Sequence, residues 1–92
     1  MKFRSDYELN VAFALNDSMQ QFNLRTAYFN LSKRELYNSI RLLLDSLANM
    51  GGRVLYIEVL SPDNVIQRDV NELFNLPEPV YSSRKEVRYE NY

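Results

Sequence analysis

The side chains that most often carry out catalysis are scarce in this chain of 92 residues, which contains no Cys, His or Trp. Without Cys or His there is no thiolate nucleophile, no imidazole base, no disulfide and no Cys/His zinc site. The serines, among them Ser32, Ser39 and Ser46, therefore have no base to activate them. We expect a protein that is not an enzyme and that binds no cofactor.

The carboxylates are the remaining chemically useful groups, and they are scattered. They include Asp6, Glu8, Asp17, Asp45, Glu58, Asp63, Asp69 and Glu72. They form no Asp-x-Asp-x-Asp-Gly calcium loop, so we expect no metal site. Glu58 lies in an apolar run, where an uncompensated buried carboxylate would be costly. We expect it to face a sheet edge or to pair with Arg25 or Arg53.

Charge and hydropathy limit the partners and the compartment. The formal net charge of −1 offers no broad positive field for a phosphate backbone, so nucleic acid is not an expected partner. The longest aliphatic run, Leu42 to Leu44, is far shorter than the roughly 20 apolar residues of a membrane-spanning helix. No secretory signal follows the basic residues at the start of the chain. We expect no transmembrane segment and a location in the cytosol or the plastid stroma.

The first half of the chain has the patterns of two strands. From Tyr7 to Leu15 apolar side chains occupy every second position, which is typical of a strand with one buried face. Turn-forming residues follow at 16–18. The segment from Phe22 to Leu31 is rich in aromatic and branched residues and predicts a second strand, antiparallel to the first.

At Ser32 the hydrophobic period changes to that of a helix. Ser32 and Glu35 have the spacing of a capping box, which starts a helix. An apolar stripe follows at Leu36, Ile40, Leu43, Leu44 and Leu47. Gly51-Gly52 then supplies a left-handed cap, so we expect a helix over 32–50. A phosphate-binding loop would open a helix, whereas this glycine pair closes one.

The second half of the chain completes an α+β fold. The apolar run from Val54 to Leu60 predicts a strand that is central in its sheet or covered on both faces. A shorter second helix is predicted from the apolar residues Val65, Ile66, Val70, Leu73 and Phe74. Asp69-x-x-Glu72 offers a second capping box, which would start this helix only at Val70. We predict a three-stranded, mainly antiparallel sheet (β-β-α-β) with the long helix on one face, a short second helix and an extended tail. The domain would span 1–76 and the tail 77–92.

Aromatic and arginine side chains are the informative part of the composition. There are seven Tyr and five Phe, and Arg outnumbers Lys eight to three. A core of this size does not hide twelve rings completely, and Tyr and Arg are enriched in desolvated protein contacts. The competing interpretation is that Phe13, Phe22, Tyr37 and Phe74 fill the core while the tyrosines are half-buried. Our candidate partner-binding residues are Arg25, Tyr28, Phe29, Arg53, Tyr56, Tyr81, Arg84 and Tyr89.

Rings on a sheet also suggest an RNA-recognition surface, in which bases stack on strand aromatics. The near-zero net charge, the absence of a Lys/Arg-Gly-Phe signature and the presence of only three clear strands argue against that interpretation.

The junction Met50-Gly51-Gly52-Arg53-Val54-Leu55, together with the aromatic pair Tyr28-Phe29 in the preceding strand, resembles the small phycobilisome linker (CpcD-like) domains, the core and rod-capping linkers among them. The resemblance covers residues 7–60. It implies a non-enzymatic linker without pigment that docks in the central hole of a phycobiliprotein disc, peripheral to the thylakoid membrane. There it would help phycobilisome assembly and energy transfer. The alternative is a small regulatory or inhibitory protein, for instance phage-encoded, that binds and occludes a protein partner.

Overall fold

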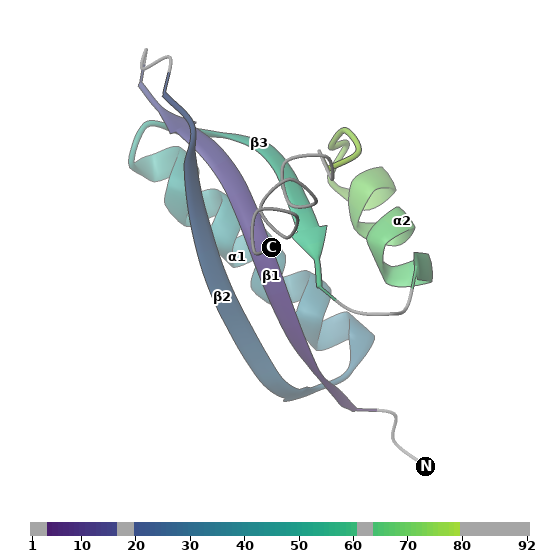
Figure 1. Cartoon of the computed structure of the whole chain (residues 1–92). Helices are drawn as coiled ribbons and strands as arrows, with labels where there is room; N and C mark the ends of the chain where they lie inside the picture. The colour runs from purple at the N-terminus through teal and green to yellow at the C-terminus, as the bar shows by residue number, and fades with distance from the viewer. Residues whose placement is uncertain (1–3, 17–19, 61–63, 80–92) are drawn as a thin grey trace, which may run out of the picture.

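The fold combines a three-stranded sheet with two helices, as Figure 1 shows for the computed structural model, which describes residues 4–16, 20–60 and 64–79. The elements are β1 (Ser5–Leu15), β2 (Phe22–Leu31), α1 (Lys33–Asn49), β3 (Gly52–Val59) and α2 (Asn64–Leu73). The strand order is β2-β1-β3, and β1 is antiparallel to both neighbours. The predicted α+β class, antiparallel sheet and long helix are confirmed.

The core lies between the sheet and α1, which crosses one face of it (Figure 1). Leu9 and Val11 of β1 are fully buried, because alternate side chains of a strand point to the same face. They share one hydrophobic cluster with Leu36 and Ile40 of α1. The even-numbered side chains of β1 therefore point to the opposite face of the sheet, which we call the open face. Ala12 and Ala14 on this face are buried, and its exposed part lies along β2.

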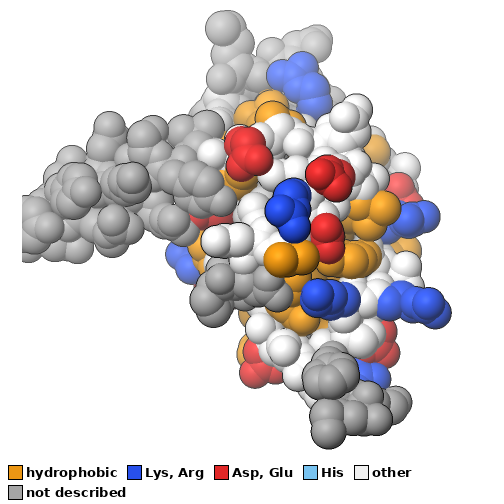
Figure 2. All heavy atoms as spheres, turned by 90° about the vertical axis from the view of Figure 1, so that its right-hand side faces the viewer, with side chains coloured by type: hydrophobic (Ala, Val, Ile, Leu, Met, Phe, Trp, Pro, Cys, Tyr) orange, Lys and Arg blue, Asp and Glu red, His pale blue; other side chains and the backbone are white. Residues whose placement is uncertain are grey.

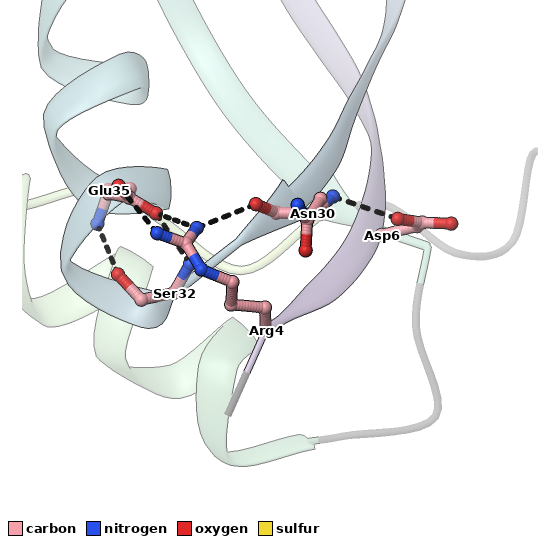
Figure 3. Close-up of polar contacts among 5 residues, drawn as sticks. All are labelled: Arg4, Asp6, Asn30, Ser32 and Glu35. Carbon is pink, nitrogen blue, oxygen red and sulfur yellow. Dashed lines mark hydrogen bonds and ion pairs between the residues drawn. The ribbon is translucent and has the colours of Figure 1, made fainter. Parts of the chain in front are cut away.

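The N-terminus of α1 has the predicted capping box. The amide of Glu35 donates to Ser32 Oγ at 3.2 Å, and the amide of Ser32 donates to Glu35 Oε1 at 2.9 Å. Figure 3 shows that Arg4, at the start of β1, also reaches this site: its Nη1 donates to Glu35 Oε1 at 2.6 Å and to the Asn30 carbonyl at 2.7 Å. The start of β1, the end of β2 and the first turn of α1 are thus tied together.

The C-terminus of α1 ends at the glycine pair, as the sequence predicts. Gly51 has φ +81°, a left-handed conformation that glycine adopts without a steric penalty. Its amide donates to the Ala48 carbonyl at 3.0 Å, and its carbonyl accepts from the Asn16 amide at 2.7 Å. A side chain at Gly52 would lie 2.9 Å from the Leu47 carbonyl, so the chain turns from helix to strand where only small residues fit.

Two details of the sequence prediction are settled by the structure. The strand predicted to be central or covered on both faces, β3, is not central, because β1 occupies the centre, but its residues 56–59 are buried on both faces. The second helix begins at Asn64, so the apolar pattern from Val65 marks its start and the later start at Val70 is wrong; Asp69 lies inside the helix and not at its cap. The earlier start brings Ile66, 2% exposed, into the core one turn before Val70. The gain from burying that side chain outweighs the local capping preference.

Beyond α2, residues 76–79 have no regular secondary structure. The rest of the predicted tail lies outside the described residues, so the boundary between domain and tail stays a prediction. Within the part of the chain that the structure describes, neither helix has the length and apolar character needed to cross a membrane.

Candidate binding surface

Three of the predicted partner-binding residues lie on the open face. Arg25 is opposite Asn10 and Arg53 is opposite Ala14, both even-numbered positions of β1. Phe29 follows Arg25 and Ala27 at alternate positions of β2 and is 69% exposed. Both arginines are exposed as well. The open face therefore presents one bare aromatic ring and two guanidinium groups.

The two tyrosines predicted on the sheet lie elsewhere or offer little surface. Tyr28 is opposite Tyr7, so it lies on the α1 side and packs, half-buried, against the core. Tyr56 is only 8% exposed. The remaining predicted residues, Tyr81, Arg84 and Tyr89, lie outside the described residues.

A row of amides crosses the open face. Asn23 Nδ2 of β2 donates to Asn10 Oδ1 of β1 at 3.2 Å, and Asn10 Nδ2 approaches Glu58 Oε1 of β3 at 3.5 Å. Gln21 extends the row by donating to Asn23 Oδ1 at 3.3 Å. Hydrogen bonds between side chains on neighbouring strands add to sheet stability and hold their groups in register. The row links all three strands and makes this part of the open face polar.

One pairing that we expected for Glu58, with Arg25, does not form. Arg25 Nη2 instead lies 2.8 Å from Glu8 Oε2. The two side chains are 63% and 49% exposed. Exposed ion pairs contribute only about 0–1 kcal/mol, so Arg25 can exchange this partner for another carboxylate at little cost.

Neither the amide row nor the role of Gln67 in α2 was predicted from the sequence. Gln67 Nε2 donates to the Ile57 carbonyl at 2.9 Å, and the Val59 amide donates to Gln67 Oε1 at 2.8 Å. A signal was present: Gln67 and Asn71 lie four residues apart, beside the apolar positions of α2, and both are buried. Buried amides at helical spacing indicate that a backbone or another side chain must satisfy them.

An open depression of about 400 Å³ lies between α1 and α2. Tyr37, Asp69, Glu72 and Leu73 line it, and the Tyr37 hydroxyl donates to Asp69 Oδ2 at 3.2 Å. Small-molecule sites bury most of their ligand. This depression would leave much of a ligand in water, so we assign it no ligand.

Charges of both signs are interspersed with hydrophobic side chains on the side of the molecule that carries α2, as Figure 2 shows. That side therefore has no large field of one sign. Among residues 4–16, 20–60 and 64–79, no three acidic side chains gather into a group that could hold a metal ion.

Comparison of the chain with models of known protein families found no match, and comparisons with curated proteins and with solved structures also found none. A three-stranded sheet packed with two helices is compatible with many activities, so the fold does not define a function. The function has to be inferred from the residues on the surface.

Proposed function

We propose that this protein is a non-enzymatic binding module whose open face docks onto another protein. The observation that carries the proposal is Phe29, a ring left 69% exposed on the same face as Arg25 and Arg53. Burying a Phe side chain completely is worth about 1.5–3 kcal/mol, so leaving this ring in water forgoes a large part of that free energy. A protein partner would recover it.

The neighbouring groups suit such a contact. Arg25 holds Glu8 only through an exposed ion pair, so its guanidinium can bind a carboxylate of the partner. Aromatic and arginine side chains near the centre of an interface supply most of its binding free energy, and the polar groups around them exclude water. The exposed amides of Gln21 and Asn23 would provide the polar surroundings.

For the partner, we propose phycobiliprotein subunits. The support is the resemblance of the Met50-Gly51-Gly52 junction to the phycobilisome linkers, together with an element order, β-β-α-β, that agrees with that family. The protein would dock in a phycobiliprotein disc, peripheral to the thylakoid membrane, and help phycobilisome assembly and energy transfer. With no Cys for a thioether bond, it would carry no pigment of its own.

The test is to mix the purified protein with phycobiliprotein trimers and to record the sedimentation and the visible spectrum. We expect a larger complex and a shift of the pigment absorption. No complex and an unchanged spectrum would reject the linker function. A regulatory protein that occludes another partner would then be the remaining binding function, and it would use the same open face.

The role of Phe29 is tested by Phe29→Ala. A central anchor loses about 2 kcal/mol of binding free energy on truncation, which is roughly a 30-fold weaker dissociation constant. Leu42→Ala is the matched control, because Leu42 of α1 is 67% exposed and lies away from the open face. Equal effects of the two substitutions would exclude the open face as the docking surface.

A further inference from the structure

The two edges of the sheet differ. On β3, the backbone groups of Ile57 and Val59 that point away from β1 are bonded by the side-chain amide of Gln67. On β2, no strand among the described residues pairs with the edge that points away from β1. We call this the outer edge of β2. Edge strands of this length template pairing with another chain unless something prevents it.

The register identifies which backbone groups of β2 point outward. The Leu60 amide donates to the Glu8 carbonyl at 2.8 Å, so even-numbered residues of β1 direct their backbone groups toward β3. Successive residues of a strand alternate between its two edges, and Leu9, opposite Thr26, therefore faces β2. By the same alternation, Thr26 points to β1, whereas Arg25 and Ala27 direct their amides and carbonyls to the outer edge.

Little on β2 prevents pairing over its middle. Natural edge strands are protected by proline, by several charges or by bulges. The ten residues of β2 contain no proline, and Arg25 is their only charge. A register shift opposite Asp6, where Asn30 has φ 60°, interrupts the strand only near its end. Leu24, 37% exposed, adds an apolar side chain to the unprotected part.

We propose that the outer edge of β2 is a dimer interface, where it pairs antiparallel with β2 of a second copy of this chain. The two-fold axis passes through Thr26, so Thr26 lies opposite itself, Arg25 lies opposite Ala27 of the second copy and Leu24 lies opposite Tyr28 of the second copy. The two sheets then form one sheet of six strands.

This register suits the charges. A pairing centred on Arg25 would place two guanidinium groups face to face, and like charges directly opposite destabilise a sheet. In the register centred on Thr26, Arg25 lies across Ala27 of the second copy, whose methyl group leaves space above the strand. Glu8 is opposite Ala27 in each copy. Arg25 of one copy therefore lies in one cross-strand row with Ala27 and Glu8 of the other copy, and this row ends in a carboxylate. Leu24 gains an apolar neighbour on the other face.

The assembly would also be closed. A two-fold pairing uses the outer edge of β2 in both copies, and the opposite end of each sheet carries α2 and Gln67 on the β3 edge. Within residues 4–16, 20–60 and 64–79, no second interface of this kind remains to extend the sheet into a fibre. The contact lies at the edge of β2 and does not depend on the partner proposed for the open face.

The first experiment measures the molar mass of the protein by sedimentation from micromolar to near-millimolar concentration. We expect a shift from the monomer of 10.9 kDa to twice that mass as the concentration rises. Because the chain has no Cys, Thr26→Cys introduces a single thiol that should form a dimer disulfide under mild oxidation. Residues in a non-hydrogen-bonded antiparallel pair lie about 4.5 Å apart at Cα, which a disulfide can span. Asn49→Cys, at the exposed end of α1, is the control and should cross-link far less.

The second experiment uses Ala27→Lys, which places a cation beside Arg25 of the second copy. We expect at least a tenfold weaker dimer, with an unchanged circular dichroism spectrum because Ala27 is exposed. Ala48→Lys adds the same charge on the exposed side of α1 and should leave the dimer intact. A monomer at every concentration would overturn the proposal. So would a dimer that Ala27→Lys leaves unchanged and that Thr26→Cys does not cross-link.

Discussion

Five residues at one corner show how single residues connect elements that are distant in the chain. Arg4 contacts Glu35, 31 residues away, and Asp6 Oδ1 accepts from the Asn30 amide at 2.9 Å (Figure 3). The Asn30 amide lies at the interruption of β2, where Asn30 has φ 60°. Asn tolerates the left-handed region better than most residues, which explains its presence there.

Glu35 should make stability depend on pH. The Arg4 guanidinium, followed by the Ser32 amide, lowers the pKa of Glu35 from 4.5 to about 2. A lowered folded-state pKa means that the carboxylate stabilises the fold above pH 4.5 and that this contribution is lost as the pH falls toward about 2. We expect Glu35→Gln to be less stable than the natural protein near neutral pH, and the difference in urea midpoint to shrink with acidification.

Arg4→Met is the companion variant, because it removes the main cause of the pKa shift and leaves the carboxylate in place. Arg4→Met should reduce the change in stability over the same pH range. A difference between Glu35→Gln and the natural protein that stays constant over this pH range would show that the ion pair does not produce the dependence.

Gly51 is a second residue with a predictable effect. Gly51→Ala places a Cβ at φ +81°, which costs about 1–2 kcal/mol and should lower the free energy of unfolding in urea by that amount. Gly51→Asn makes the same Cβ contact with the Asn16 side chain but tolerates the left-handed region better, so its loss should be smaller. Equal losses would assign the effect to that contact and not to the backbone conformation.

At the level of elements, α2 acts as the covering of an edge strand. Its apolar side chains Ile66 and Val70 enter the core, and Gln67 between them takes the place of the peptide group that a fourth strand would supply. The side-chain amide of Gln67 thus lies where a fourth strand would pair with β3. Unpaired backbone groups in a buried position are costly, which explains the amide at this position.

Gln67→Leu should show how much the stability of the protein depends on the hydrogen bonds of this amide. The substitution keeps an apolar side chain of similar length but leaves the Val59 amide and the Ile57 carbonyl without their bonds to Gln67. We expect a loss of about 1–3 kcal/mol in the free energy of unfolding, together with faster hydrogen exchange at the Val59 amide.

Arg68→Leu changes the neighbouring, exposed position of α2 and should alter neither quantity by a comparable amount. Unchanged exchange at Val59 in Gln67→Leu would mean that the side-chain amide does not protect the edge of β3.

At the level of the whole molecule, one core joins β1, β3, α1 and α2. Because these elements share their buried side chains, we expect the protein to unfold as a single cooperative unit. Leu9→Ala removes a fully buried side chain of the central strand and should cost about 2–5 kcal/mol. Circular dichroism and tyrosine fluorescence should report the same midpoint in urea.

Val70→Ala tests the same core from α2, where the side chain is also fully buried. It should lower that shared midpoint without separating the two signals. Two distinct transitions in either variant would show that α2 unfolds independently of the sheet.

The residues that begin, end or pattern the helices and strands could be recognised from the sequence alone. The period of two in β1, the capping box at Ser32, the apolar stripe of α1 and the glycine pair after it all act within a few residues of one another. Such local interactions are visible in a linear pattern. They predicted the fold class and the bounds of β2 and α1 to within one residue.

Contacts between distant residues could not be recognised in the same way. The central position of β1, the insertion of Gln67 at the β3 edge and the contact between Arg4 and Glu35 each depend on how separate elements pack. Packing also placed Tyr28 on the α1 side and left Phe29 bare. A local pattern predicts whether a segment is a helix or a strand. Which elements pack against each other depends on how the apolar surfaces of all elements are buried together.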